Sequence, residues 1–444
     1  MSPYLSRRDF LAASSAAVVA TQLPAASAAA TGAAPAKLAL QGGEKAVKSG
    51  AGKLVRWGDP ERQRLSAMID QPSLFFYKGP QTLALIERFR QHHPLKHVMT
   101  CSSGTAALHI AVAAAGIGPG DEVITTPITD PGTIIGVLYQ QGVPVFADLE
   151  ADTANLSVDA VARAITPRTK AIIAVHLTGN PCDLDGLRQL ADQHKLVLIE
   201  DCAQSWGAKF RGQPVGTFGH IACFSLQNSK QITCGDGGVV ASNDERFGPR
   251  LARYADKGMV RESGKPFEST ETLGTNYRMS EPQAAVAAAQ LDRLEAIAEK
   301  RSQLGRALTE GISGLSAIVP PRVRADDRCT YWFYLFMLKP ERLRCKRPEF
   351  AKALTAEGAP IAAGYIPIPI YGMPVFQRHA FFAGRWPIKE MGLTKMDYTK
   401  TTCPVSDAII ANCMRFTLHE AMSETYVREI ASAIRKVAQH YTTT

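Results

Sequence analysis

Short apolar runs alternate with helical periodicity between about residues 96 and 245. The pattern predicts apolar strands that end near 100 and that lie at 122–125, 143–146, 171–175 and 196–199. It predicts helices at 105–115, about 131–141 and about 184–194. The runs 171–175 and 196–199 contain no polar alternation, which is typical of strands buried on both faces. The chain is therefore predicted to be an α/β protein with a mostly parallel sheet wrapped by helices.

The remainder of the chain predicts a second, smaller domain. A helical stretch at 281–308 follows the sheet region, and an aromatic and apolar run at 331–337 is typical of a strand. The last amphipathic helix is predicted at 424–441. We predict an N-terminal arm at 29–57, a large domain at 58–309 and a small C-terminal α+β domain at 310–444.

The first 35 residues have the composition of a targeting segment. Arg7 and Arg8 precede Phe10, an apolar run rich in Ala follows, and residues 26–28 read Ala-Ser-Ala. This order predicts a twin-arginine signal peptide at 1–28, with mature protein from near Ala29 in the periplasm. The alternative is an Ala-rich leader with a chance arginine pair, which would leave the protein in the cytoplasm.

Composition and charge narrow the class of protein. Of the 444 residues, 45% are apolar and 20% are charged, which excludes disordered and fibrous chains. The 50 Lys and Arg against 41 Asp and Glu give a net charge of +9, but the basic residues are scattered, so we predict no nucleic-acid partner. The nine cysteines include no C-x-x-C pair, and no metal site is predicted. After the signal, no apolar stretch is long enough to span a membrane.

Familiar nucleotide and hydrolase motifs are absent from the sequence. There is no G-x-x-x-x-G-K-[ST] and no G-x-G-x-x-G after a strand, so P-loop and Rossmann chemistry have no support. There is also no H-E-x-x-H and no G-x-S-x-G. The chemistry must therefore lie in other residues at the carboxyl ends of the predicted strands, where ligands of such sheets bind.

The first candidate is the Ser103-Gly104-Thr105 segment, which precedes an Ala-rich helix. Free N–H groups at a helix start, together with small hydroxyl residues, suit a phosphate group. A helix N-cap without any ligand is the alternative, because the same residue types serve both purposes.

The second and third candidates are an acidic pair and a lysine. Glu200 and Asp201 directly follow the strand predicted at 196–199, where a buried carboxylate is costly unless it is paired. Lys230 ends the segment 223–230, soon after an apolar strand and before a Gly-rich turn, and desolvation there would make its amine a nucleophile. The alternatives are a loop or capping acid and an ordinary surface lysine.

A phosphate site, a buried carboxylate and an activated lysine are what pyridoxal 5'-phosphate (PLP) requires of a protein. The phosphate needs amide donors, the ring nitrogen needs a carboxylate, and the aldehyde needs an amine. The combination predicts PLP as the cofactor.

The sequence resembles the DegT/DnrJ/EryC1/StrS family of fold-type I, PLP-dependent sugar aminotransferases. The resemblance extends from about 38 to 440 and rests on six ordered motifs. These are 102–109, 119–124, 175–179, 199–204, 224–230 with 235–238, and 276–279.

The resemblance implies roles for particular residues. It implies that Lys230 forms the internal aldimine and shuttles the proton, that Asp201 pairs with the pyridine nitrogen, and that Gln204 lies beside the ring oxygen. It also implies that a phosphate is bound by the residues Ser103, Gly104, Thr105 and Ser225. Asn276 would reach the phosphate of a neighbouring subunit, which implies a homodimer with shared active sites. His176 either lines the site or is a core histidine.

One position departs from the family pattern. Members usually place an aromatic ring over the cofactor in the loop that follows the strand 122–125, and this chain has Asp130 near that place. The change leaves open whether the cofactor is stacked and suggests a different polar contact to the substrate. The segment 365–371 resembles a substrate-side loop of the family, and a Pro-rich structural turn is the alternative.

The resemblance implies an aminotransferase that moves an amino group from glutamate or glutamine to a keto-sugar or keto-cyclitol. The small-molecule donor and the keto acceptor are its expected partners. Two alternatives stay open: a PLP-dependent sugar dehydratase or lyase, and an exported protein that binds a ligand on the same fold without turnover. The identity of the donor and acceptor and the stereochemistry also stay open.

Overall fold

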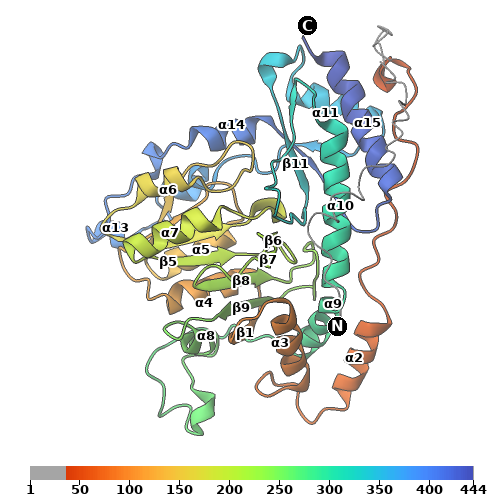
Figure 1. The fold of residues 1–444 in the computed structure, drawn as a ribbon. Coiled ribbons are helices and arrows are strands. Elements are labelled where there is room, and N and C mark those ends of the chain that lie inside the picture. Colours follow the sequence, from red (N-terminus) through yellow and green to blue (C-terminus); the bar gives the residue numbers. More distant parts are fainter. Residues whose placement is uncertain (1–36, 444) are drawn as a thin grey trace, which may run out of the picture. The chain divides into compact units, whose positions relative to one another are not determined.

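A seven-stranded sheet forms the core of the structure, a computed structural model that describes residues 37–443 (Figure 1). The strand order is β1-β9-β8-β5-β4-β2-β3, and only β9 runs antiparallel to its neighbours. The strands are β1 (His97–Cys101), β2 (Glu122–Thr125), β3 (Val143–Phe146), β4 (Thr169–Val175), β5 (Val197–Asp201), β8 (Ile221–Ser225) and β9 (Gly238–Ser242). The predicted signal peptide at 1–28 lies outside the described residues.

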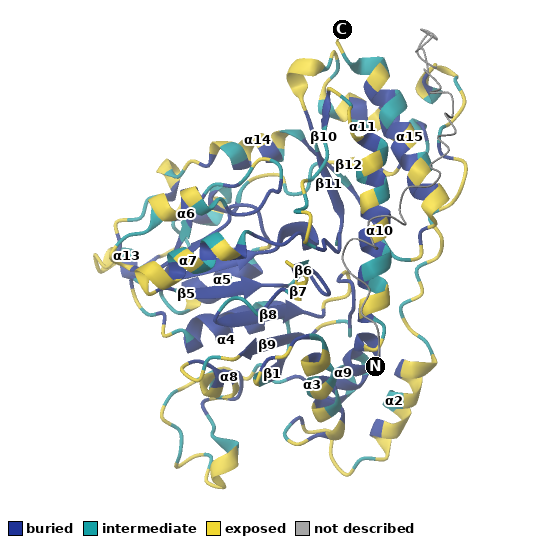
Figure 2. Ribbon diagram, in the orientation of Figure 1, coloured by how far each residue is buried: buried dark blue, intermediate teal, exposed yellow. Residues whose placement is uncertain are grey.

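Helices cover both faces of this sheet, as the pattern of non-alternating strands predicts. On one face, α4 and α8 pack on β8, β9 and β1. On the other face, residues of α3, α7 and α9 share one core with the strands. Figure 2 shows the central strands buried and the outer faces of the helices exposed. The α-helices of this part are α2 (Asp59–Ile69), α3 (Pro80–His92), α4 (Gly104–Ala114), α5 (Gly132–Tyr139), α6 (Val158–Ala164), α7 (Leu184–His194), α8 (Gly248–Ala255) and α9 (Glu281–Leu291).

A second, antiparallel sheet has the order β10-β11-β13-β12. Its apolar face shares a core with α10, α11 and α15, and α10 lies along α15 (Figure 1). These elements are β10 (Ile318–Val319), β11 (Tyr334–Leu338), β12 (Ile361–Ala363), β13 (Cys413–Phe416), α10 (Leu294–Ile312), α11 (Arg347–Ala356) and α15 (Glu424–Tyr441). The predicted fold class, an α/β fold-type I architecture with a second C-terminal domain, is confirmed.

Several short elements complete the chain. They are β6 (Lys209–Phe210), β7 (Gln213–Pro214), α12 (Pro374–Gln377), α13 (Pro387–Glu390), α14 (Pro404–Asn412) and the 3-10 helices η1 (Ala39–Gln41), η2 (Leu177–Gly179), η3 (Arg261–Ser263), η4 (Pro340–Arg342), η5 (Ile370–Gly372) and η6 (Tyr398–Lys400). The arm buries Leu38 and Val47 in the core of the antiparallel sheet. The predicted domain boundary at 309/310 falls within the last turn of α10 and stays a prediction.

Two predicted elements differ from the structure. The single helix at 281–308 is two helices, α9 and α10, with Asp292 and Arg293 between them. The strand predicted to begin at Tyr331 begins instead at Tyr334. Tyr331 has a φ of 40°, and the Trp332 N–H donates to the carbonyl oxygen of Thr178 at 2.7 Å. The intervening residues therefore bond to the loop after β4 and not to β13.

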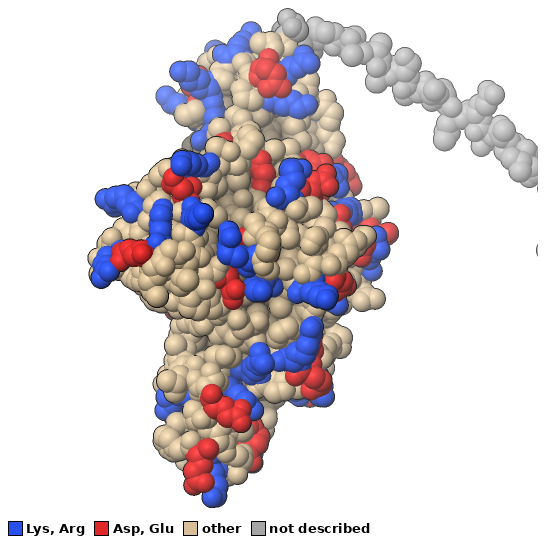
Figure 3. Space-filling view, turned by 90° about the vertical axis from the view of Figure 1, so that its left-hand side faces the viewer, with Lys and Arg blue, Asp and Glu red and all other residues tan. Residues whose placement is uncertain are grey.

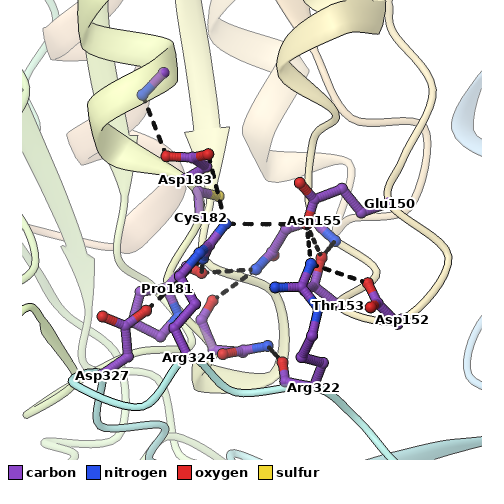
Figure 4. Close-up of polar contacts among 12 residues, drawn as sticks. Glu150, Asp152, Thr153, Asn155, Pro181, Cys182, Asp183, Arg322, Arg324 and Asp327 are labelled. Carbon is purple, nitrogen blue, oxygen red and sulfur yellow. Dashed lines mark hydrogen bonds and ion pairs between the residues drawn. The ribbon is translucent and has the colours of Figure 1, made fainter.

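A polar network ties the segment 322–327 to loops of the parallel sheet (Figure 4). Arg322 pairs with Asp152 at 2.5 Å and with Glu150 at 3.2 Å, and its N–H donates to the carbonyl oxygen of Asp152 at 2.9 Å. Arg324 lies 3.8 Å from Asp183. Exposed pairs of this kind contribute little individually, but a network with backbone bonds fixes a segment in place. The network therefore anchors the segment 322–327, which precedes Trp332 in the sequence.

Lys and Arg are interspersed with Asp and Glu on the face that Figure 3 shows, so the positive charge does not gather there into one patch. Within residues 37–443, none of the helices has both the length and the apolar character needed to cross a membrane.

Candidate active site

A cavity of about 310 Å³ lies at the carboxyl ends of the parallel strands. Its lining includes Asp201 at the end of β5, Ser225 at the end of β8, and the start of α4, which follows β1. This is the edge at which ligands of parallel sheets bind. Seven of the predicted site residues line it: Ser103, Gly104, Thr105, Asp201, Gln204, Ser225 and Lys230.

The start of α4 forms a cradle of backbone N–H groups. Ser103 is the N-cap, and its Oγ accepts the N–H of Ala106 at 3.0 Å. Within residues 37–443, the N–H groups of Gly104 and Thr105 have no bonded acceptor. A Cβ on Gly104 would lie 2.6 Å from the Cβ of Ser225, so only glycine allows this approach. The N-cap interpretation is confirmed. The cap leaves two N–H groups available, which suits an anion, and the phosphate site stays a prediction.

Asp201 is a buried carboxylate with both oxygens oriented. Its Oδ2 accepts the hydroxyl of Thr133 at 2.9 Å, and its Oδ1 accepts the N–H of Ala203 at 3.1 Å. Burial raises the pKa of Asp201, and the two hydrogen bonds and the charge of Lys230 oppose that rise. A carboxylate in this setting is stabilised by a cation placed in the cavity.

Gln204 is held by contacts on both sides of its amide. The Thr178 N–H donates to its Oε1 at 2.8 Å, and its Nε2 lies 3.4 Å from the hydroxyl of Tyr365. The first contact fixes the orientation of the amide, because only the oxygen can accept that bond. Gln204 therefore presents a fixed polar group beside Asp201.

Lys230 has a desolvated amine. The side chain is only 8% exposed, and Nζ lies 3.8 Å from the centre of the Trp332 ring. Burial lowers the pKa of Lys230 from 10.5 to about 8, opposed by the negative charges of Asp201 and Asp130. Arg56 donates to the carbonyl oxygen of Lys230 at 2.8 Å, which fixes the backbone. The amine is therefore a nucleophile and a base close to neutral pH.

The lowered pKa of Lys230 predicts how fast the protein captures an aldehyde. Only the neutral amine attacks, so the rate is expected to rise about tenfold per pH unit and to level off above the pKa of about 8. A lysine with the ordinary value of 10.5 would continue to gain rate up to that pH. Stopped-flow absorbance of the cofactor-free protein mixed with PLP between pH 6 and 10.5 measures this. A rate that still climbs above pH 9.5 would contradict the desolvated amine.

Glu200 and His176 lie away from the cavity, which corrects one expectation. β5 extends through Glu200 and Asp201, so the acidic pair does not follow the strand, and the pleat sends the two carboxylates to opposite faces. Glu200 accepts the N–H groups of Gly216 and Phe218 and lies 3.1 Å from Nε2 of His176. His176 is fully buried and does not line the cavity, so it is a core histidine.

The same buried pair forms a cluster with the thiol of Cys202. One ligand atom from each of the three residues lies within 4.8 Å of the others. Both oxygens of Glu200 already accept backbone N–H groups, and Nδ1 of His176 lies 3.1 Å from the N–H of Cys182. The cluster is therefore a hydrogen-bond network on the face of β5 opposite the cavity.

Asn276, like Glu200 and His176, does not line the cavity of its own chain. It is exposed and pairs with Asp256 in an isolated bridge. The 365–371 segment is divided: Tyr365 approaches Gln204, whereas Ile370 and Tyr371 are buried in a separate apolar core. The structural interpretation holds for Ile370 and Tyr371, and a substrate-side role for Tyr365 stays a prediction.

Sequence reasoning missed three contacts of the site. These are Thr133 on Asp201, Arg56 on the backbone of Lys230, and Trp332 over its amine. Thr133 lies in the first turn of α5, three residues after Asp130. Its hydroxyl is a hydrogen-bond donor close to a predicted site residue, and that was the available signal. Trp332 and Arg56 carried no signal, because their roles depend on contacts between segments more than 100 residues apart.

Comparisons with known proteins agree with this geometry. The model of the DegT/DnrJ/EryC1/StrS aminotransferase family matches residues 59–435. The chain is 37% identical over 386 residues to L-glutamine:2-deoxy-scyllo-inosose aminotransferase of Streptomyces kanamyceticus, covering 82% of this chain and 87% of that protein. It is 36% identical to the dTDP-3-amino-3,4,6-trideoxy-alpha-D-glucose transaminase of Streptomyces venezuelae, covering 70% and 79%. The structure of an aminotransferase from Psychrobacter cryohalolentis superposes with a TM-score of 0.78 at 27% identity, covering 88% and 100%.

Proposed function

This chain belongs to the DegT/DnrJ/EryC1/StrS family of PLP-dependent aminotransferases, and we propose that it transfers an amino group from glutamate or glutamine to a keto-sugar or keto-cyclitol. Its membership makes it an aminotransferase of sugars or cyclitols. The main support from this chain's own residues is a single observation. The desolvated Lys230 and the buried Asp201 line one cavity with the start of α4, whose first N–H groups are available. The name of the Streptomyces kanamyceticus relative supports glutamine as the donor and a cyclitol as the acceptor.

The residues of the cavity fit PLP. A Cβ on Gly104 would lie 2.6 Å from the Cβ of Ser225, so glycine lets the start of α4 approach Ser225, and Ser103, Thr105 and Ser225 line the same part of the cavity. Asp201 is buried and, among residues 37–443, contacts no cationic side chain, which suits a protonated ring nitrogen. We propose that these residues, with Gln204 and Lys230, hold the cofactor.

The side chains then divide the work of the reaction. When bound, PLP supplies an aldehyde that bonds to amines and a ring that withdraws electrons from the reacting carbon. The negative charge of Asp201 keeps a proton on the ring nitrogen, and Thr133 fixes the direction of that carboxylate. Nζ of Lys230 has a pKa of about 8. It could therefore take a proton from the donor carbon that bears the amino group and pass that proton to the aldehyde carbon of the bound cofactor.

The donor half of the reaction is the direct test of this function. With PLP added, glutamate or glutamine is expected to bleach the cofactor band of the protein and to release one equivalent of the corresponding 2-oxo acid per site. Absorbance and enzymatic detection of the oxo acid measure the two outcomes. A band that no amino acid changes would contradict transamination. In that case, turnover of a sugar without amino-group exchange would favour the lyase, and its absence would favour the binding protein.

We also propose a homodimer with shared active sites. Asn276 is exposed and lies outside its own cavity, as a residue that serves a neighbouring subunit would. The same region of the chain exposes Phe267 to 79% and Leu273 to 82%, and apolar side chains that are exposed to this extent favour a protein partner. Light scattering of the purified protein tests this, and a monomer at micromolar concentration would reject it.

Export is a proposal that rests on the sequence of residues 1–28 alone. Arg7 and Arg8 support a twin-arginine route, which carries folded proteins and would allow the cofactor to be loaded before export. Cell fractionation of the protein and of an Arg7→Lys, Arg8→Lys variant tests it. Equal recovery of both proteins from the cytoplasm would reject the proposal.

A further inference from the structure

The loop between β2 and α5 places a carboxylate in the cavity. Asp130 lines the cavity and is exposed to it, and its Oδ1 accepts the N–H of Gly132 at 2.8 Å. Within residues 37–443, no donor is bonded to its Oδ2. The carboxylate is therefore held by one oxygen in a tight turn, while the other remains available to a ligand.

The turn is packed closely enough to keep this carboxylate in place. A Cβ on Gly132 would lie 2.6 Å from Oγ1 of Thr105 and 3.0 Å from Oδ1 of Asp130. The turn thus lies directly against the start of α4, and the loop has little freedom to withdraw Asp130 from the cavity. An aromatic ring at this position would offer a stacking face, whereas Asp130 offers a charged acceptor.

The lysine side of the same cavity provides the aromatic surface instead. Trp332 covers Nζ of Lys230, and its ring N–H donates to the carbonyl oxygen of Ser229 at 2.7 Å. The ring of Tyr365 lies 6.5 Å from that of Trp332 and nearly perpendicular to it, at 89°. Asp130, Lys230 and Trp332 line the same cavity, and the hydroxyl of Tyr365 lies 3.4 Å from Nε2 of Gln204 on that lining. An aromatic face and a free carboxylate oxygen therefore flank the reacting amine.

This combination suits one kind of ligand. The C–H groups of a saturated ring pack on an indole face, and its hydroxyl groups donate to a carboxylate. A diphosphate group brings negative charge toward the same carboxylate, and like charges in a binding site cost affinity. An uncharged ring with hydroxyl groups can pack on the ring of Trp332 and also donate hydrogen bonds to the carboxylate of Asp130.

We propose that Asp130 is a specificity-determining residue: it accepts hydrogen bonds from the hydroxyl groups of an uncharged acceptor ring that lies against Trp332, and it disfavours nucleotide-linked acceptors. The inference rests on the proposed transaminase function and narrows its acceptor to free keto-sugars and keto-cyclitols. Such an acceptor also needs no nucleotide-sugar supply, which is consistent with an exported enzyme.

An Asp130→Asn variant tests the proposal, because it keeps the shape of the side chain and removes its charge. The probes are 2-deoxy-scyllo-inosose as the free acceptor and a dTDP-linked keto-sugar as the charged one. The wild type is expected to prefer the free acceptor in kcat/KM. The variant is expected to lose about ten- to a hundredfold in kcat/KM with 2-deoxy-scyllo-inosose, as befits a lost hydrogen bond to a charged group, and to gain with the dTDP-linked sugar.

Asp236→Asn is the matched control, since Asp236 is another exposed carboxylate on the lining of the same cavity. If the charge of the cavity alone decided the preference, both variants would change it equally, and the special role of Asp130 would be rejected. A wild type that prefers the dTDP-linked sugar would also overturn the proposal.

Binding of an unreactive ring separates this inference from the proposed function. Calorimetry with scyllo-inositol and cofactor-free protein is expected to show affinity in the wild type that falls about tenfold in Asp130→Asn and in Trp332→Ala. The donor half-reaction of the wild type, measured separately, tests the transaminase function on its own. Loss of that half-reaction in the wild type rejects transamination alone, whereas equal scyllo-inositol affinity in the wild type and Asp130→Asn rejects the role of Asp130.

Discussion

Replacing Lys230 with alanine is expected to abolish transamination without unfolding the protein. Nζ of Lys230 is buried beside Trp332 and has a pKa of about 8, so it combines the nucleophile and the proton carrier in one group. Proton transfer by a positioned side chain contributes about 10²- to 10⁴-fold, and loss of the covalent route adds to it. We expect the overall rate to fall by at least about 10³-fold, measured as 2-oxo acid released in the presence of donor and acceptor.

Lys209→Ala is the matched control for this variant. Lys209 is a half-buried lysine that pairs with Glu295 at 3.4 Å outside the cavity, and its removal is expected to leave the rate within about twofold. Near-ultraviolet circular dichroism of both variants checks the fold. A Lys230→Ala protein that is folded and retains more than a tenth of the rate would show that another group carries the proton.

The architecture of the large sheet could be predicted because its strands are buried on both faces. From Ala171 on, β4 reads Ala-Ile-Ile-Ala-Val, and β5 begins with Val-Leu-Ile; neither stretch has polar alternation, which is a strong local signal. The start of the strand predicted at 331–337 was wrong, because β11 begins at Tyr334. Its aromatic residues fit a strand by composition, but the left-handed conformation of Tyr331 and the bond from Trp332 to Thr178 depend on tertiary contacts.

The site could be predicted as far as the topology alone determines it. Asp201, Ser225 and the start of α4 all follow from the rule that ligands bind at the carboxyl ends of parallel strands. The period of two along β5 implies that only one of Glu200 and Asp201 can face the cavity, but not which one. Trp332 could not be predicted, because its place over Lys230 requires the network that anchors the segment 322–327.

The structure also shows why Asp201 should matter more than its two hydrogen bonds suggest. Replacing Asp201 with asparagine keeps the size of the side chain and lets Thr133 and Ala203 retain polar contacts. The loss is the negative charge, and removing one preorganised electrostatic partner costs about 10²- to 10³-fold in rate. Stopped-flow absorbance of the donor half-reaction measures the loss, whereas capture of PLP by Lys230 is expected to persist.

A cofactor with a permanent charge distinguishes this role of Asp201 from a structural one. PLP methylated at the ring nitrogen is cationic without a proton, so it does not need a carboxylate to remain charged. With this cofactor, the donor half-reaction of Asp201→Asn is expected to be at least about tenfold faster than with PLP. Thr133→Val, which removes the hydroxyl that orients Asp201 but keeps its charge, is expected to lose less than about tenfold. If the methylated cofactor gave no recovery, or if Thr133→Val were as impaired as Asp201→Asn, the carboxylate would be acting through geometry and not through its charge.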